Sequence, residues 1–167
     1  FALHATPLDA GAAVLVFPGG DLDSCKPFAK RYQIEFGRRR GFIRTALRER
    51  VPIVPVVSVG AHQSLFIATD GRFIAEALGL PSRFRSNVWP IGFALPYGLV
   101  FGLPAPHFPP PVKIHTRILA PIRFDLPPQA ADDPDLVESC AEHVTGIMQA
   151  TLDELRDAGR HGLFPTG

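Results

Sequence analysis

The sequence predicts an α/β fold with a mostly parallel sheet flanked by helices, on three observations. The two strongest apolar runs, residues 12–17 and 53–59, have the length of strands that are buried on both faces. A helical pattern at residues 38–50 separates them and completes the order of a β-α-β unit. The strand ends of such a unit carry the chemistry, so we expect the site within residues 14–60.

The length of 167 residues fits a single domain, residues 1–167, with a core of its own. The two cysteines, Cys25 and Cys140, have no metal-ligand spacing, so we expect neither a bound metal nor a disulfide framework. The chain opens at Phe1, and its first residues lack the pattern of a signal peptide. We therefore expect a fragment of a longer protein from a reducing compartment.

The first strand ends in a turn with two glycines, Gly19 and Gly20. Glycine adopts backbone angles that other residues avoid, so the chain turns sharply there and its amides can approach a ligand. A packing turn without a ligand would have the same sequence, and both interpretations stay open. The turn is followed by an ambiguous segment, residues 26–36, that alternates in part like a strand.

Positive charge is concentrated between the two strands, although the formal net charge is only +1. In the helix of residues 38–50, Arg40, Arg44 and Arg48 recur every four residues and form a stripe on one face. Clustered arginine favours phosphate-bearing ligands or an anionic membrane surface, and a solvated helix face is the alternative. No nucleic-acid-binding motif accompanies the charge, so we expect no nucleic acid as a partner.

Polar residues follow the second strand, where α/β proteins place binding groups, and His62 is the titratable residue among them. An ordinary polar loop is the alternative for His62. A short helix is expected at residues 73–80, and residues 112–119 alternate like a half-exposed strand. The last helix, residues 133–158, begins with an aspartate and a proline and has an apolar face that would cover the sheet.

A hydrophobic insert at residues 88–112 carries no formal charge and is rich in proline and aromatic residues. Its prolines would leave backbone groups unpaired in lipid, so we do not expect a spanning helix. We expect a bent hairpin that is buried in the fold or lies in a membrane interface, with Trp89 and Tyr97 at headgroup level. Membrane contact is the favoured alternative because the basic helix would favour the same surface.

Three motifs stand out in residues 11–60, namely Phe17-Pro18-Gly19-Gly20, Arg39-Arg40-Gly41-Phe42-Ile43-Arg44-Thr45-Ala46 and Val51-Pro52-Ile53-Val54-Pro55-Val56. Together they resemble the lysophospholipid/glycerol acyltransferase superfamily, in the branch closest to the diacylglycerol acyltransferases. Their order and spacing match the family over about residues 11–60, and the resemblance is looser beyond. The resemblance implies an enzyme that transfers a fatty acyl group from acyl-CoA, its co-substrate, to a lipid hydroxyl without a cofactor.

The resemblance also assigns substrate-binding residues. It implies a glycine turn that holds the acceptor and arginines that bind CoA phosphates or lipid headgroups, namely Phe17, Pro18, Gly19, Gly20, Arg39, Arg40 and Arg44. Gly19 and Leu22 stand where the phospholipid branch commonly has glutamate and arginine, and loss of that arginine removes a phosphate ligand. We therefore expect a neutral acceptor such as diacylglycerol or a fatty alcohol. Asp23 stands where neutral-lipid members tend to carry an acidic residue, and it would orient the acceptor or cap a helix.

The family's catalytic pair is a histidine and an aspartate with four residues between them; the histidine removes the hydroxyl proton and the aspartate orients the ring. His4 and Asp9 have this spacing. In the family the pair lies several tens of residues before the glycine turn, and here Pro7 breaks the helical turn that would join the two side chains. Either His4 and Asp9 are the pair in an unusual place, or the pair lies in upstream sequence and the chain is an inactive C-terminal part.

Two other functions stay open. A non-catalytic membrane-binding module needs only the basic helix and the aromatic hairpin. A magnesium-dependent phosphatase would use Asp21 and Asp23 after a buried strand, although residues 18–20 intervene. For the acyltransferase we expect acyl-CoA, a lipid acceptor and an anionic membrane surface as partners, at the cytoplasmic face of a membrane in a peripheral or interfacial position.

Overall fold

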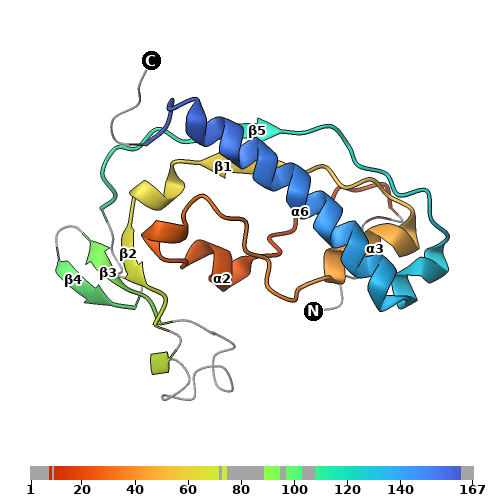
Figure 1. The fold of residues 1–167 in the computed structure, drawn as a ribbon, viewed down its shortest axis with the longest axis horizontal. Helices are drawn as coiled ribbons and strands as arrows, with labels where there is room; N and C mark the ends of the chain where they lie inside the picture. Colours follow the sequence, from red (N-terminus) through yellow and green to blue (C-terminus); the bar gives the residue numbers. More distant parts are fainter. Residues whose placement is uncertain are drawn as a thin grey trace.

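The computed structural model describes residues 8, 10–71, 73–74, 89–94, 97–102 and 108–162. Within them the chain forms two small antiparallel sheets and three α-helices (Figure 1). The helices are α2 (Gly20–Ser24), α3 (Gly41–Glu49) and α6 (Pro134–Asp157). The strands are β1 (Val56–Val59), β2 (Phe66–Thr69), β3 (Ile91–Ala94), β4 (Gly98–Phe101) and β5 (His115–Ile118).

The pairing of the strands contradicts the predicted mostly parallel sheet. β1 pairs with β5 in one sheet, β2, β3 and β4 form the other in that order, and every pair is antiparallel. The prediction of an acyltransferase-like α/β sheet is therefore wrong for the described chain. A continuous apolar run indicates a buried segment, but it holds no information about which strand becomes its neighbour or in which direction.

Residues 12–17, predicted as the central strand, belong to neither sheet. They form no regular secondary structure, and the side chains of Leu15 and Phe17 are 76% and 77% exposed. A central strand needs a neighbour on each edge, whereas β1 pairs with β5 alone. The predicted β-α-β unit is thus absent from the described residues.

The helix α6 covers β1 and packs against α3 (Figure 1). Pro134 occupies its first turn, and the carboxylate of Asp133 accepts hydrogen bonds from the backbone amides of Asp135 (2.9 Å) and Leu136 (3.2 Å). This cap explains why the helix begins where the aspartate and proline stand, inside the range that its periodicity predicts.

Two buried clusters lie beneath α6. The first joins α3, α6 and the 3-10 helix η3 (Pro128–Asp132), and its most buried members are Ile43, Leu47, Ala131, Val137, Ala141 and Val144. The second joins Val57 and Val59 of β1 to Leu152 and Leu155 of α6. The helix therefore holds α3 and the β1–β5 sheet together through one continuous apolar face.

The hydrophobic insert contributes β3 and β4, which pair as a hairpin and add β2 as the third strand. Ile67 and Ala94 are buried on the inner face of this sheet, at 3% and 2% exposure. Residues 75–80 of the expected short helix, and residues 88, 95–96 and 103–107 of the insert, lie outside the described part of the chain. No helix among the described residues is long and apolar enough to cross a bilayer.

Candidate functional site

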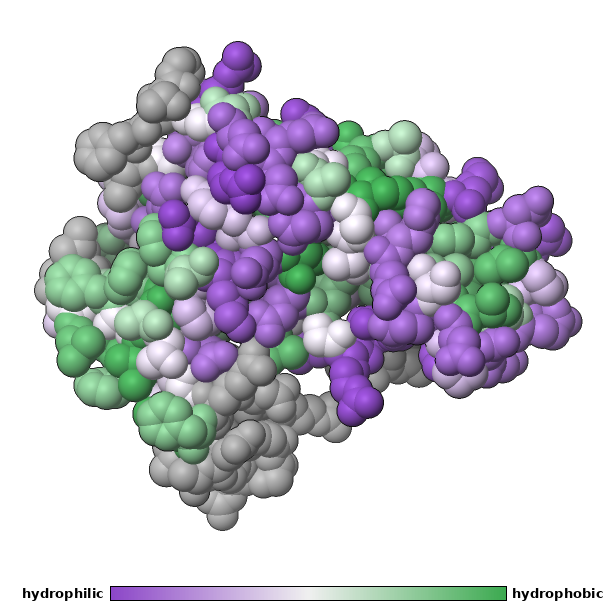
Figure 2. Space-filling view, viewed as in Figure 1, coloured by the Kyte–Doolittle hydropathy of each residue, from purple (hydrophilic) through white to green (hydrophobic). Residues whose placement is uncertain are grey.

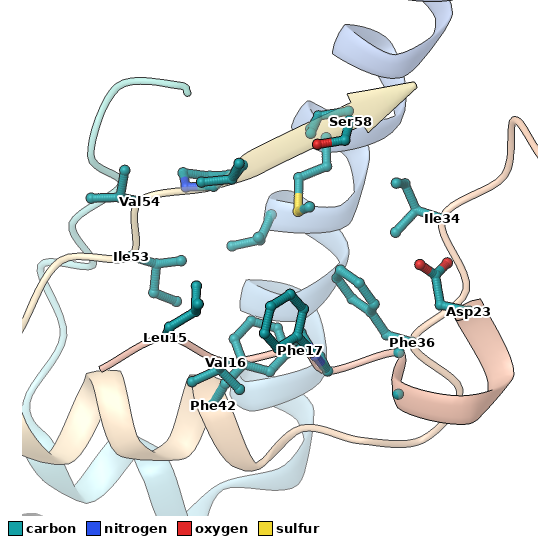
Figure 3. Close-up of a pocket in the computed structure, with 18 of the residues that line it drawn as sticks. Leu15, Val16, Phe17, Asp23, Ile34, Phe36, Phe42, Ile53, Val54 and Ser58 are labelled. Atoms are coloured by element: carbon teal, nitrogen blue, oxygen red, sulfur yellow. The ribbon is translucent and has the colours of Figure 1, made fainter. Parts of the chain in front are cut away.

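A cavity of about 1120 Å³ lies between residues 11–20, β1 and α6. Most of its wall is apolar, and it includes Leu15, Val16, Phe17, Ile34, Phe36, Phe42, Ile53, Val54, Val56 and Met148. Figure 3 shows Leu15, Ile53 and Val54 around one end, and Asp23 and Ser58 toward the other. The cavity thus has an apolar end and a polar end.

The glycine turn forms part of the cavity wall and leads directly into α2. Gly20 has a φ of 51°, a conformation that strains residues with a Cβ atom, and a Cβ there would also collide with the guanidinium of Arg39. That guanidinium donates to the carbonyls of Pro18 (3.4 Å) and Gly19 and pairs with the carboxylate of Asp21. Arg39 therefore fixes the shape of the turn from outside the cavity.

Asp23 and Lys26 form an ion pair at the polar end. The Asp23 carboxylate accepts hydrogen bonds from the Lys26 ammonium (2.8 Å) and from the backbone amide of Glu35 (3.2 Å). The Lys26 side chain is only 3% exposed, and its ammonium also donates to the carbonyl of Gln33 (2.5 Å). A buried ammonium is costly without such partners, so Asp23 neutralises Lys26 while facing the cavity.

His62 also lines the polar end, from the 3-10 helix η2 (Ala61–Gln63) that follows β1. Burial lowers the pKa of its imidazole, the nearby charge of Lys26 lowers it further, and Asp23 opposes the change. The ring is therefore neutral at pH 7, and a neutral imidazole can accept a proton. The polar end combines a proton acceptor, a carboxylate and an ammonium.

The predicted arginine stripe faces α6 and η3. The guanidinium of Arg40 donates to both carboxylate oxygens of Glu138 (2.8 and 2.7 Å), and this bond raises the pKa of Arg40 and lowers the pKa of Glu138. Arg44 donates to the carbonyl of Ala131 (2.8 Å). A ligand phosphate at either arginine would compete with these bonds.

The structure brings together part of the predicted site. Phe17, Pro18, Gly19, Gly20 and Asp23 all line the cavity, whereas Arg39, Arg40 and Arg44 lie outside its lining. The predicted catalytic pair, His4 and Asp9, lies outside the described residues. The described residues contain no group of three or more histidine, cysteine or acidic side chains that could hold a metal ion.

Sequence reasoning missed the role of Lys26. Lys26 belongs to the basic segment and its sequence context does not indicate burial. Asp23 is only three residues away, but the second partner, the Gln33 carbonyl, meets Lys26 only after the chain turns at residues 25–33. The position of His62 directly after a strand made it a candidate from the sequence. That His62 and Lys26 line the same cavity could not be predicted.

The chain is similar over nearly its whole length to proteins of mycobacteria. It is 33% identical over 158 residues to an uncharacterized protein of Mycobacterium tuberculosis and to one of Mycobacterium bovis. It is 32% identical over 158 residues to an uncharacterized protein of Mycobacterium leprae. These alignments cover 94% of this chain but only 41% of the first two relatives and 40% of the third. No protein-family model and no solved structure matches the chain.

Proposed function

We propose that this protein transfers a fatty acyl group from acyl-CoA to the hydroxyl of a neutral lipid, such as diacylglycerol or a fatty alcohol. The observation that carries the proposal is the cavity with one apolar and one polar end. An alkyl chain needs continuous apolar wall, and a reacting hydroxyl needs a proton acceptor beside it. The motif resemblance at residues 17–20 supports the same assignment, because this turn lines the cavity.

The size of the cavity suits this substrate class. Ligand pockets typically enclose roughly 300–1,000 Å³, and the volume of about 1120 Å³ lies just above that range. Apolar contact with residues such as Val16 and Val54 would remove the alkyl chain from water, which is the main source of affinity for a lipid.

The reaction requires that the hydroxyl lose its proton as it attacks. The hydroxyl oxygen forms a bond to the thioester carbonyl carbon, the carbon–sulfur bond breaks, and the proton reaches the departing thiol through a base. His62 is the described cavity residue with a neutral imidazole for this task. His4, oriented by Asp9, is the alternative base that the sequence predicts. Asp23 would orient the acceptor hydroxyl.

Recognition of the CoA phosphates is assigned to Arg39, Arg40 and Arg44 by the resemblance. Each guanidinium already has an acceptor within the chain, namely the glycine turn, Glu138 and the carbonyl of Ala131. A bound phosphate would therefore replace an existing hydrogen bond of each guanidinium and would not add a new one. We expect the affinity for acyl-CoA to be weaker than the number of arginines suggests.

A cavity-filling substitution tests the assignment. Val54 lines the apolar end and is 47% exposed, so Val54→Trp should shift the preferred acyl-CoA toward shorter chains without unfolding the protein. Ile118→Trp is the matched control, because Ile118 is 71% exposed on β5 and outside the cavity lining. Transfer of labelled acyl groups of graded length to diacylglycerol and to a fatty alcohol is the measurement.

The assay should include this chain and, in parallel, the M. tuberculosis relative, of which the chain spans 41%. Substitutions His62→Gln and His4→Gln in this chain separate the two candidate bases: the true base is the one whose loss abolishes transfer while the folded fraction stays unchanged. Absence of transfer to any lipid hydroxyl by both proteins would refute the proposed function.

A further inference from the structure

The outer face of the β2–β3–β4 sheet is apolar across all three strands. The register sets Phe66 opposite Phe93 and Phe93 opposite Leu99, so these side chains form one row on the same face. Phe101 stands two residues beyond Leu99 and continues that face along β4. The four side chains are 48%, 53%, 65% and 64% exposed in chain order, and we call them the apolar sheet face.

Such a face departs from the usual construction of an antiparallel sheet. One side normally packs on the core and the other carries polar residues, and here Ile67 and Ala94 already occupy the core side. The three strands contain no charged residue. Four side chains that are about half exposed leave roughly 400 Å² of apolar surface, at about 150–250 Å² for each aromatic residue. A patch of this size matches the largest apolar patch of a typical monomeric protein, and such patches are often functional.

Positive charge borders the apolar sheet face. The ring of Phe28, in the 3-10 helix η1 (Phe28–Lys30), lies with its centroid 5.1 Å from that of Phe66. The guanidinium carbon of Arg31 lies 4.1 Å from the Phe28 ring centroid, and Lys30 beside it is exposed. Arg31 therefore carries its charge beside Phe28, which contacts Phe66 at the edge of the face formed by β2, and the exposed Lys30 is its neighbour in the chain.

The combination fits the interfacial zone of a bilayer. Acyl tails match an apolar surface without hydrogen-bonding groups, and anionic headgroups at the same level match adjacent cations. Figure 2 shows a group of hydrophobic residues over the end of the molecule that carries β2, β3 and β4 in Figure 1, with further hydrophobic residues toward the opposite end. Of the predicted aromatic anchors in the insert, Tyr97 is 50% exposed beside β4. The positive charge near the face comes from Lys30 in η1 and from Arg31 directly after it, and not from the arginine stripe of α3 as predicted.

We propose that the apolar sheet face docks on a bilayer that contains anionic lipid, with Lys30 and Arg31 among the headgroups. The strand β2 links this surface to the cavity, because Leu65 and Ile67 line the cavity while Phe66 belongs to the outer face. A lipid acceptor can then pass from the bilayer to the cavity around this strand. Only this use as an entry route rests on the proposed function; the docking surface does not.

Co-sedimentation with vesicles tests the surface without any acyl-CoA. The double substitution Phe93→Ser with Leu99→Ser should lower the partition coefficient by about tenfold or more on vesicles of phosphatidylcholine with phosphatidylglycerol. Ile118→Ser is the matched control, since Ile118 is 71% exposed on β5, in the other sheet, and should leave binding unchanged. Circular dichroism checks that all variants remain folded.

The charged border has its own test. Lys30→Glu should weaken binding to the anionic vesicles but not to phosphatidylcholine alone, and added salt should remove the difference. Equal loss in the double variant and in Ile118→Ser, or binding unaffected by either, would overturn the proposal. Concentration-dependent dimerisation that the double variant abolishes, without vesicle binding by the parent chain, would assign the face to a second copy instead. Because binding is read without substrates, failure of acyl transfer leaves this outcome unaffected.

Discussion

Removal of the Asp23 carboxylate tests how the polar end of the cavity is held together. Asp23→Ala deletes two hydrogen bonds at once, one from the Lys26 ammonium at 2.8 Å and one from the Glu35 amide at 3.2 Å. It also leaves the ammonium of Lys26, which is 3% exposed, with the Gln33 carbonyl as its remaining hydrogen-bond acceptor among the described residues. The protein should therefore lose stability although Asp23 itself is partly exposed.

The size of the loss follows from these contacts. A hydrogen bond to a charged group contributes about 1.5–3 kcal/mol and a neutral one about 0.5–1.5 kcal/mol. Both bonds end on the Asp23 carboxylate, and because this side chain is 35% exposed, solvent screening places their summed contribution at or slightly below the lower end of the range for two such bonds. We expect Asp23→Ala to lower the free energy of unfolding by about 2–3 kcal/mol, which corresponds to a fall in Tm of roughly 4–12 °C for a chain of this size.

Urea unfolding followed by circular dichroism measures this loss, and a double-mutant cycle with Lys26→Met assigns it. Methionine removes the buried charge while keeping most of the side-chain volume, so Asp23→Ala should cost only about 1 kcal/mol in that background. A loss below about 0.5 kcal/mol in the parent chain, or the same loss with and without Lys26, would refute the reasoning. Acceptor KM measured on the folded fraction then shows whether Asp23 also orients the substrate.

Two further predictions concern the titratable groups around the cavity. The pKa of His62 is lowered in the folded chain, so the unfolded chain takes up a proton first as the pH falls below the ordinary histidine pKa of 6.5, and the folded chain loses stability. His62→Gln should reduce this loss, and urea unfolding above and below that pH checks it; an unchanged pH dependence would contradict the assigned burial of His62. Glu138→Gln should remove the charged partner of Arg40, which keeps its bond to the Gly37 carbonyl, and, if Arg40 binds CoA phosphates, raise CoA affinity by roughly twofold to fivefold in calorimetry. Glu142→Gln is the control because Glu142 acts on Arg40 only through its charge, and equal affinity in all three proteins would assign Arg40 to structure alone.

Features set by near neighbours in the chain could be predicted. The start of α6 follows from Asp133 and Pro134, which cap and shape a helix through atoms only a few residues away. The arginine helix α3 and the sharp turn at Gly20 are equally local. The hairpin of β3 and β4 lies within the bent insert that its prolines and apolar residues predict.

Features set by distant neighbours could not be predicted, and the predicted sheet shows why. The runs at residues 12–17 and 53–59 were both identified as apolar and extended, but strand pairing depends on closing long loops and on competition among several possible edges. The structure pairs β1 with β5, and it leaves residues 12–17 outside both sheets. The hydrophobic periodicity within a segment does not indicate which other strand will pair with it.

The same division separates what is known of the site. The sequence by itself determined the glycine turn, the basic helix, the apolar character of the flanking segments and the position of His62 after a strand. Only the tertiary structure decided that Arg40 bonds to Glu138, that Lys26 is buried with its ammonium on the Gln33 carbonyl, and that the insert turns an apolar sheet face outward. The physical reason is that burial and ion pairing depend on which distant surfaces meet, whereas turns, caps and helix periodicity depend on atoms within a few residues of each other.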